Sequence, residues 1–157
     1  MLMRHTKRLL GVIAVMFVAA CTDNSITNPY GNVAGTYQLT VFSGRSLPAT
    51  FTYTAGQVDY LPNGGTIRWT DGTMVLDRNG TFVETNNATV TPNGEASFSD
   101  AFVSTGTYTY NGVDFTLSAP AQNNRPARYA TGTLEFDRIN YDEQNSDGTT
   151  SSFEYMR

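Results

Sequence analysis

A strict alternation of apolar and polar residues recurs in short segments along most of this chain. In one of them, the apolar residues Tyr37, Leu39 and Val41 are separated by single polar residues. The same pattern occupies residues 50–54, 67–69, 107–110, 113–117, 134–136 and 153–155, and the apolar residues Met74 and Leu76 precede Asp77. Successive side chains of a strand point to opposite faces, so each segment predicts a strand with one buried and one exposed face, as in antiparallel sheets. No segment carries apolar residues at helical spacing over three turns, and we expect no substantial helix.

Turn residues separate these segments. Asn111-Gly112 predicts a two-residue hairpin turn, and Asp77–Gly80 predicts a longer one. Further turns are predicted at Asp71-Gly72, Asn93-Gly94 and Asp147-Gly148, and loops at Pro62–Gly65 and Pro120–Pro126. Seven Gly-Thr pairs open β-like segments at irregular spacing, which argues against a solenoid or propeller repeat. We therefore predict an all-β, up-and-down antiparallel meander of about eight to ten strands that hides its edges by closing into a barrel.

The first 33 residues have a different composition. Three basic residues precede an apolar run, Leu9–Ala20, which ends at Cys21 and is followed by polar residues. This order is typical of a secretory signal peptide, and the run is too short for a transmembrane helix, which needs about 20 residues. We predict a signal peptide over residues 1–20, a polar flexible tether over 21–33 and one barrel domain over 34–157.

The segment Val18-Ala19-Ala20-Cys21 resembles the lipobox of bacterial lipoprotein signal peptides. The resemblance implies that Cys21 is lipidated and becomes the first residue of the mature protein, with more than one acyl chain, as stable anchoring requires. The alternatives are an ordinary secretory cleavage site and a buried free thiol, which the position of Cys21 at the apolar-to-polar switch disfavours. In enteric lipoproteins an Asp directly after the cysteine retains the protein at the inner membrane. Thr22 stands there, so we expect a lipid-anchored protein of the cell envelope at the outer membrane.

Loss of residues 1–20 would leave 7 basic and 14 acidic residues, a net charge of −7. Such a chain repels phosphate backbones, and we expect no nucleic-acid partner. His5 and Lys7 are the only histidine and lysine, and both lie in the predicted signal. Without them, and with Cys21 lipidated, Ser–His and Cys–His catalysis, a lysine Schiff base and His or Cys zinc sites are excluded. A carboxylate pair stays open, but no sequence context singles one out, so we expect no enzyme activity and no cofactor.

Several turn-and-strand phrases resemble the small bacterial lipocalin-like lipoproteins. They are Gly35–Leu39, Asp77–Phe82, Gly106–Gly112 and Gly132–Phe136. The resemblance implies a barrel that holds a ligand. Lipocalins have Gly-x-Trp on the first strand, where this chain has Tyr37. They also have a late arginine that packs across the tryptophan, a part that Arg138 or Arg157 would take here.

The leading hypothesis is a non-catalytic protein that binds a small apolar or amphipathic ligand inside the barrel. Its pocket would be lined by Tyr37, Trp69, Tyr108 and Tyr110; the alternative is that these aromatic residues fill a packed core. The second hypothesis is a protein-interaction module, either an envelope structural protein or an acidic inhibitor of a basic enzyme.

One acidic segment approaches the spacing of a calcium-binding loop. It runs from Glu143 through Asp147-Gly148 to Glu154. The first position is Glu rather than Asp, and residues 153–155 have the pattern of a strand rather than of an exiting helix. The alternative is a hairpin tip with solvated acids, and we expect no metal site.

Overall fold

The computed structural model describes residues 30–58, 61–122, 126–145 and 148–157, and it contains ten β-strands in this range. The strands are β1 (Gly35–Phe42), β2 (Arg45–Ser46), β3 (Ala49–Tyr53), β4 (Gly65–Leu76), β5 (Thr81–Pro92), β6 (Phe98–Tyr110), β7 (Asp114–Ala119), β8 (Arg128–Glu135), β9 (Arg138–Gln144) and β10 (Thr150–Met156). The described residues form no helix, so none of them could cross a membrane as a helix.

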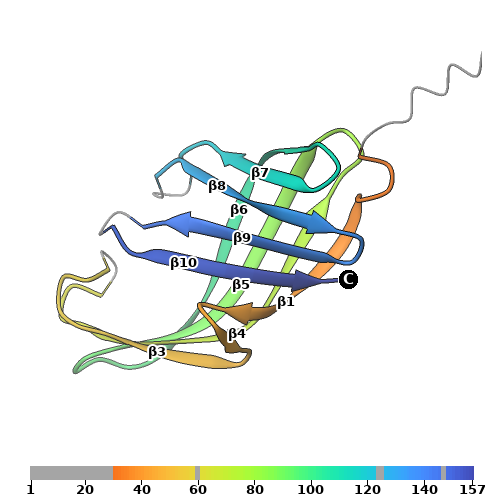
Figure 1. Ribbon diagram of the computed structural model, residues 1–157. Coiled ribbons are helices and arrows are strands. Elements are labelled where there is room, and N and C mark those ends of the chain that lie inside the picture. The colour runs from red at the N-terminus through yellow and green to blue at the C-terminus, as the bar shows by residue number, and fades with distance from the viewer. Residues whose placement is uncertain (1–29, 59–60, 123–125, 146–147) are drawn as a thin grey trace, which may run out of the picture.

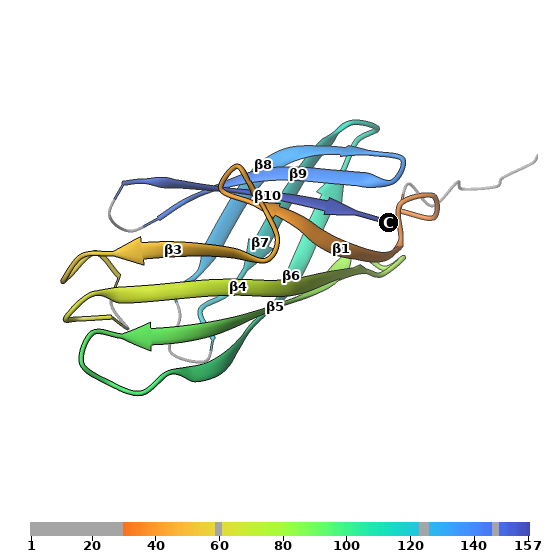
Figure 2. The same cartoon turned by 90° about the horizontal axis from the view of Figure 1, so that it is seen from below.

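Strands β4 to β10 follow one another around an up-and-down antiparallel meander, and β1 pairs with both β10 and β4. This double pairing closes a barrel of eight strands, β1 and β4 to β10. Figures 1 and 2 show the curled sheet from two directions. The predicted all-β barrel is therefore confirmed. Closure pairs β1 with β4 through Gly35–Gln38 and with β10 through Gln38–Phe42, which removes the long open edges that β4 and β10 would otherwise expose. The short strands β2 and β3 pair on one side only.

Strand β4 pairs with two different strands along one of its edges. Its first half, from Gly65 to Trp69, pairs with β3, and its second half, from Thr73 to Leu76, pairs with β1. A register shift between Trp69 and Asp71 separates the halves, and the strand continues through it. In Figure 2 the β3–β4–β5 sheet reaches beyond the rest of the barrel on one side.

Three local predictions were wrong. Asp71-Gly72 is no turn, because both residues pair with β5 inside β4. The β6–β7 turn spans three residues, 111–113, rather than two, because β6 ends at Tyr110 and β7 begins at Asp114, so Val113, predicted in a strand, lies in the turn. Phe136, predicted in a strand, lies in the turn between β8 and β9 at a φ of 42°. Of the turn predicted at Asp147-Gly148, Asp147 lies outside the described residues.

The core consists of the inward-facing side chains of the strands and of Leu61, which lies between β3 and β4. The largest that are fully buried are Tyr37, Tyr108, Tyr155, Phe82, Phe115, Leu61, Ile67, Met74, Leu76, Leu134, Ile139 and Glu84. Packing extends before β1 as well: Val33 is 3% exposed, and the ring of Tyr30 packs edge-on against Tyr108 at 5.0 Å. The last four residues of the predicted tether, 30–33, thus lie against the barrel.

Candidate functional site

Strand β5 carries polar side chains into the barrel. Its inward positions run Phe82, Glu84, Asn86, Ala88 and Val90, and all five are buried. Glu84 is 0% exposed, although a buried carboxylate is costly unless it is paired and hydrogen-bonded. The alternating pattern does not reveal this strand, because the polar residues Glu84 and Asn86 stand at two of its inward positions.

Both carboxylate oxygens of Glu84 accept hydrogen bonds from across the barrel. Oε1 accepts from Nδ2 of Asn86 at 3.1 Å, from the hydroxyl of Tyr155 at 2.5 Å and from the hydroxyl of Tyr141. Oε2 accepts from Nη1 of Arg128 at 2.6 Å. The Tyr155 hydroxyl also lies 2.9 Å from Oδ1 of Asn86. Donors from β5, β8, β9 and β10 therefore meet at one carboxylate.

Arg128 connects this carboxylate to a second one. Its Nε donates to Oε1 of Glu143 at 2.7 Å, and its Nη2 donates to Oε2 of Glu143 at 2.6 Å. The side chains of Arg128 and Glu143 are 21% and 17% exposed, so the pair lies at the margin of the interior. One guanidinium between two carboxylates leaves these three groups with a net charge of −1. We call Glu84, Asn86, Arg128, Tyr141, Glu143 and Tyr155 the interior cluster.

The environment of the interior cluster shifts the pKa values of its carboxylate and tyrosine groups in opposite directions. Burial alone would raise the pKa of Glu84, but the charge of Arg128 and the hydrogen bonds from Tyr141 and Tyr155 outweigh it and hold that pKa below its usual range. Burial, together with the charge of Glu84, raises the pKa of Tyr141 and of Tyr155 well above the usual value. Glu84 is thus held as an anion and the tyrosines as neutral donors.

Two further polar atoms in the core have no hydrogen-bond partner among the described residues: Oγ of Ser104 and Nε1 of Trp69. Ser104 is 3% exposed and stands opposite Glu84 in the β5–β6 register. It therefore borders the interior cluster without a bond to it. Trp69 is 7% exposed and packs against Phe42 and Phe102 at centroid distances of 4.8 and 4.9 Å.

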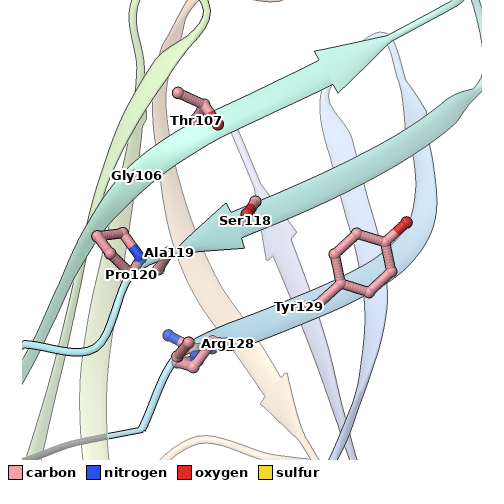
Figure 3. A pocket seen from close by; sticks show the side chains of 8 residues that line it. Gly106, Thr107, Ser118, Ala119, Pro120, Arg128 and Tyr129 are labelled. Carbon is pink, nitrogen blue, oxygen red and sulfur yellow. The ribbon is translucent and has the colours of Figure 1, made fainter.

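A depression of about 410 Å³ opens beside Arg128, where β6, β7 and β8 lie next to one another (Figure 3). Thr107, Ser118 and Tyr129 form one cross-strand row on the outer face of these strands. Tyr129 is 66% exposed. The residues that line the depression are Gly106, Thr107, Ser118, Ala119, Pro120, Ala127, Arg128 and Tyr129. Most of them are small, which leaves the space open beside the tyrosine ring.

Three of the four aromatic residues predicted to bind a ligand bond to backbone carbonyl groups of the chain itself. The hydroxyl of Tyr37 donates to Val33 at 2.7 Å, that of Tyr108 to Asp77 at 2.8 Å and that of Tyr110 to Gly112 at 2.6 Å. Burial raises the pKa of Tyr108 to about 12. These tyrosines lie near the end of the barrel that holds the β4–β5 and β6–β7 turns.

Trp69, the fourth predicted residue, lies apart from the tyrosines. It is five positions along β4 from Met74, the register partner of Tyr37. At about 3.3 Å per residue, this separation is roughly 16 Å. The structure therefore brings three of the four residues together and leaves Trp69 with Phe42 and Phe102.

The ends of the calcium-like segment lie on opposite faces of the sheet. Glu143 shares the inward face of β9 with Tyr141 and binds Arg128, whereas Glu154 lies between the inward-facing Phe153 and Tyr155. Within the described ranges, no three His, Cys, Asp or Glu side chains are grouped so that they could hold a metal ion. Cys21, the predicted lipidation site, lies outside the described residues.

Comparisons of the chain with protein-family models, with curated proteins and with solved structures each give no match.

Proposed function

We propose that this chain is a lipid-anchored, non-catalytic binding protein of the bacterial cell envelope. It takes up a small, neutral, amphipathic ligand in the depression beside Arg128 and Tyr129. The observation that carries this proposal is the depression itself, whose volume of about 410 Å³ lies within the range of small-molecule sites. The anchor is the lipid on Cys21, and Thr22 after it favours the outer membrane.

The chemistry of the lining selects the class of ligand. The exposed ring of Tyr129 offers an apolar surface, and the hydroxyls of Thr107 and Ser118 stand beside it in the same row. An arginine has five N–H groups, and the bonds to Glu84 and Glu143 use three of them. The two further N–H groups suit a carbonyl or hydroxyl acceptor.

The charge balance disfavours an anionic ligand. Glu84 and Glu143 together more than neutralise Arg128, so the guanidinium does not act as an unpaired cation for a phosphate or carboxylate. A ligand with an apolar body and a neutral polar group fits both the ring and the hydroxyls. Binding inside the barrel by Tyr37, Trp69, Tyr108 and Tyr110 stays a separate prediction.

The test is extraction of the protein purified without detergent, followed by mass spectrometry of the extract. Wild type should release a ligand, whereas Tyr129→Ala, which removes the ring, and Ala127→Trp, which fills the depression, should release little. Phe98→Ala is the matched control, because Phe98 is 48% exposed on β6 but does not line the depression. Retention in both test variants would rule out this site and favour the barrel interior. No ligand in wild type would favour the protein-interaction module.

A further inference from the structure

Phe136 occupies an unusual position for a large apolar residue. It forms the turn between β8 and β9, it is 92% exposed, and its φ of 42° lies in the left-handed region that favours glycine. Neither core packing nor backbone preference accounts for a phenylalanine here. A single exposed apolar residue is ordinary on a protein surface, so its surroundings decide what it signifies.

A second exposed apolar residue lies at the neighbouring turn. Val113, in the β6–β7 turn, is 48% exposed. Its carbonyl oxygen accepts a hydrogen bond from the backbone N–H of Leu134 at 2.9 Å, which places this turn beside the end of β8. Phe136 follows two residues after Leu134. The two exposed side chains therefore belong to the same end of the barrel.

The chain also enters the barrel at this end. The backbone N–H of Arg157 donates to the carbonyl of Asp137 at 2.7 Å, and its Nη2 donates to the carbonyls of Val33, at 3.4 Å, and Ala34. The turn of Phe136 is thus joined through Arg157 to the residues just before β1. Figure 1 shows the β8–β9 turn, the C-terminus and the start of β1 at one end.

Covalent geometry limits how far this end can be from a lipid on Cys21. Nine peptide units connect Cys21 to Tyr30, and an extended chain spans at most about 3.6 Å per residue, so the two lie within roughly 32 Å. An anchor on Cys21 would therefore keep the end of the barrel that carries Phe136 close to the membrane surface.

We infer that Phe136, with Val113 beside it, contacts the bilayer that holds the anchor and orients the barrel on it. This inference rests on the lipid anchor of the proposed function. Aromatic side chains are favoured at the boundary between headgroups and acyl chains. Glu135, Asp137 and Arg138 flank the turn with charges of both signs, so apolar contact rather than net charge provides the attraction. The β5–β6 turn at the opposite end would face away from the membrane.

The test uses variants of the full chain that each carry one introduced cysteine besides Cys21, expressed with the signal and reconstituted into phosphatidylcholine vesicles. Cys21 is the only native cysteine, so with Cys21 lipidated an introduced thiol takes up a polarity-sensitive fluorophore alone. Phe136→Cys places the probe at the proposed contact. Glu95→Cys is the matched control, because Glu95 is exposed in the β5–β6 turn at the opposite end. Lipids with a spin label near the headgroup then quench whichever probe touches the bilayer.

We expect several-fold stronger quenching of the probe at position 136 than of the probe at position 95. Vesicle flotation is measured on the same samples. Flotation with equal or no quenching overturns the inference and leaves the anchor intact, whereas loss of flotation overturns the anchor and the inference with it. Unlabelled Phe136→Gly keeps a residue suited to the left-handed φ, and unchanged thermal unfolding of this variant would show that Phe136 is not needed for folding.

Discussion

The guanidinium of Arg157 lies over the ring of Tyr37, with its Cζ atom 5.0 Å from the ring centroid. The same arginine donates to the carbonyls of Val33 and Ala34, and the hydroxyl of Tyr37 donates to Val33. Arg157 thereby links the end of β10 to β1 and to the two residues before it. Of the two arginines that the sequence left open for this role, the structure places Arg157 over the ring, whereas Arg138 is exposed at the start of β9.

Arg157→Ala should lower the free energy of unfolding by about 1–2 kcal/mol, because it removes a cation–π contact and hydrogen bonds from a charged donor. Urea denaturation of wild type and variant measures the difference. Arg138→Ala is the control and should change stability by less than about 0.5 kcal/mol, as is usual for an exposed side chain. Equal effects of the two substitutions would contradict a specific role for Arg157.

Glu84→Gln should destabilise the fold by about 3 kcal/mol, since it leaves Arg128 with only one of its two carboxylates and Tyr141 and Tyr155 without a charged acceptor. The amide has nearly the same shape, so the effect reports charge and hydrogen bonding rather than volume. Glu135→Gln, on the exposed end of β8, is the matched control. Chemical denaturation compares the two, and a loss below about 1 kcal/mol at position 84 would refute the importance of the interior cluster.

The interior cluster should also set limits on stability at both ends of the pH scale. The pKa of Glu84 is lowered in the folded state, so its contribution is present above the unfolded value of about 4.3 and is lost as pH falls below it. The pKa values of Tyr141 and Tyr155 are raised, so their contribution is present below about 10 and is lost as pH rises above it. Melting temperature measured against pH should fall at both ends, and Glu84→Gln should flatten the acid limb. An unchanged acid limb in that variant would assign it to other carboxylates.

Gly72→Ala should cost about 1–3 kcal/mol, because a Cβ there would overlap the side-chain amide oxygen of Asn86 and approach Cβ of Leu39 to 3.0 Å. The side chain of Asn86 would have to move and break its hydrogen bonds with Glu84 and Tyr155. In an Asn86→Ala background the same substitution should cost less, since the obstructing amide is gone. A double-mutant cycle by urea denaturation measures this coupling, and equal costs in both backgrounds would argue against it.

Cys21→Ala should move the protein from the membrane fraction to the soluble fraction, because it removes the proposed site of the acyl chains. Cell fractionation followed by immunoblotting measures the distribution. Ser25→Ala, four residues later, is the control and should stay with the membrane. If the Cys21 variant also stays there, the lipid anchor is wrong.

Strand β5 marks a limit of what could be predicted. The alternation in β1, β7 and β10 identified those strands because their inward residues are apolar. Glu84 and Asn86 break the same alternation, and their burial depends on partners about 40 to 70 residues away in sequence. The depression beside Tyr129 was likewise not predictable, because it depends on which strand ends lie side by side.

Phe136 is the reverse case, in which an alternating pattern predicts a strand position that the fold does not contain. Its place two residues after Leu134 continues an alternating pattern, which predicts a strand at Phe136. The chain instead turns at Glu135, which pairs with Arg138, and Phe136 points into solvent. Local pattern cannot distinguish an inward strand position from a turn position when both carry an apolar residue.

The sequence by itself determined the all-β class, the antiparallel pairing and several turns, among them Asp77–Gly80 and Asn93-Gly94, because alternation and turn residues are local properties of the chain. Tertiary structure alone decided that β1 closes the barrel against β4 and that Arg157 covers Tyr37. It also decided that Glu84 on β5 forms an ion pair with Arg128 on β8. Each of these joins residues far apart in sequence. Their free energy depends on distance and burial in the folded chain, which no local pattern specifies.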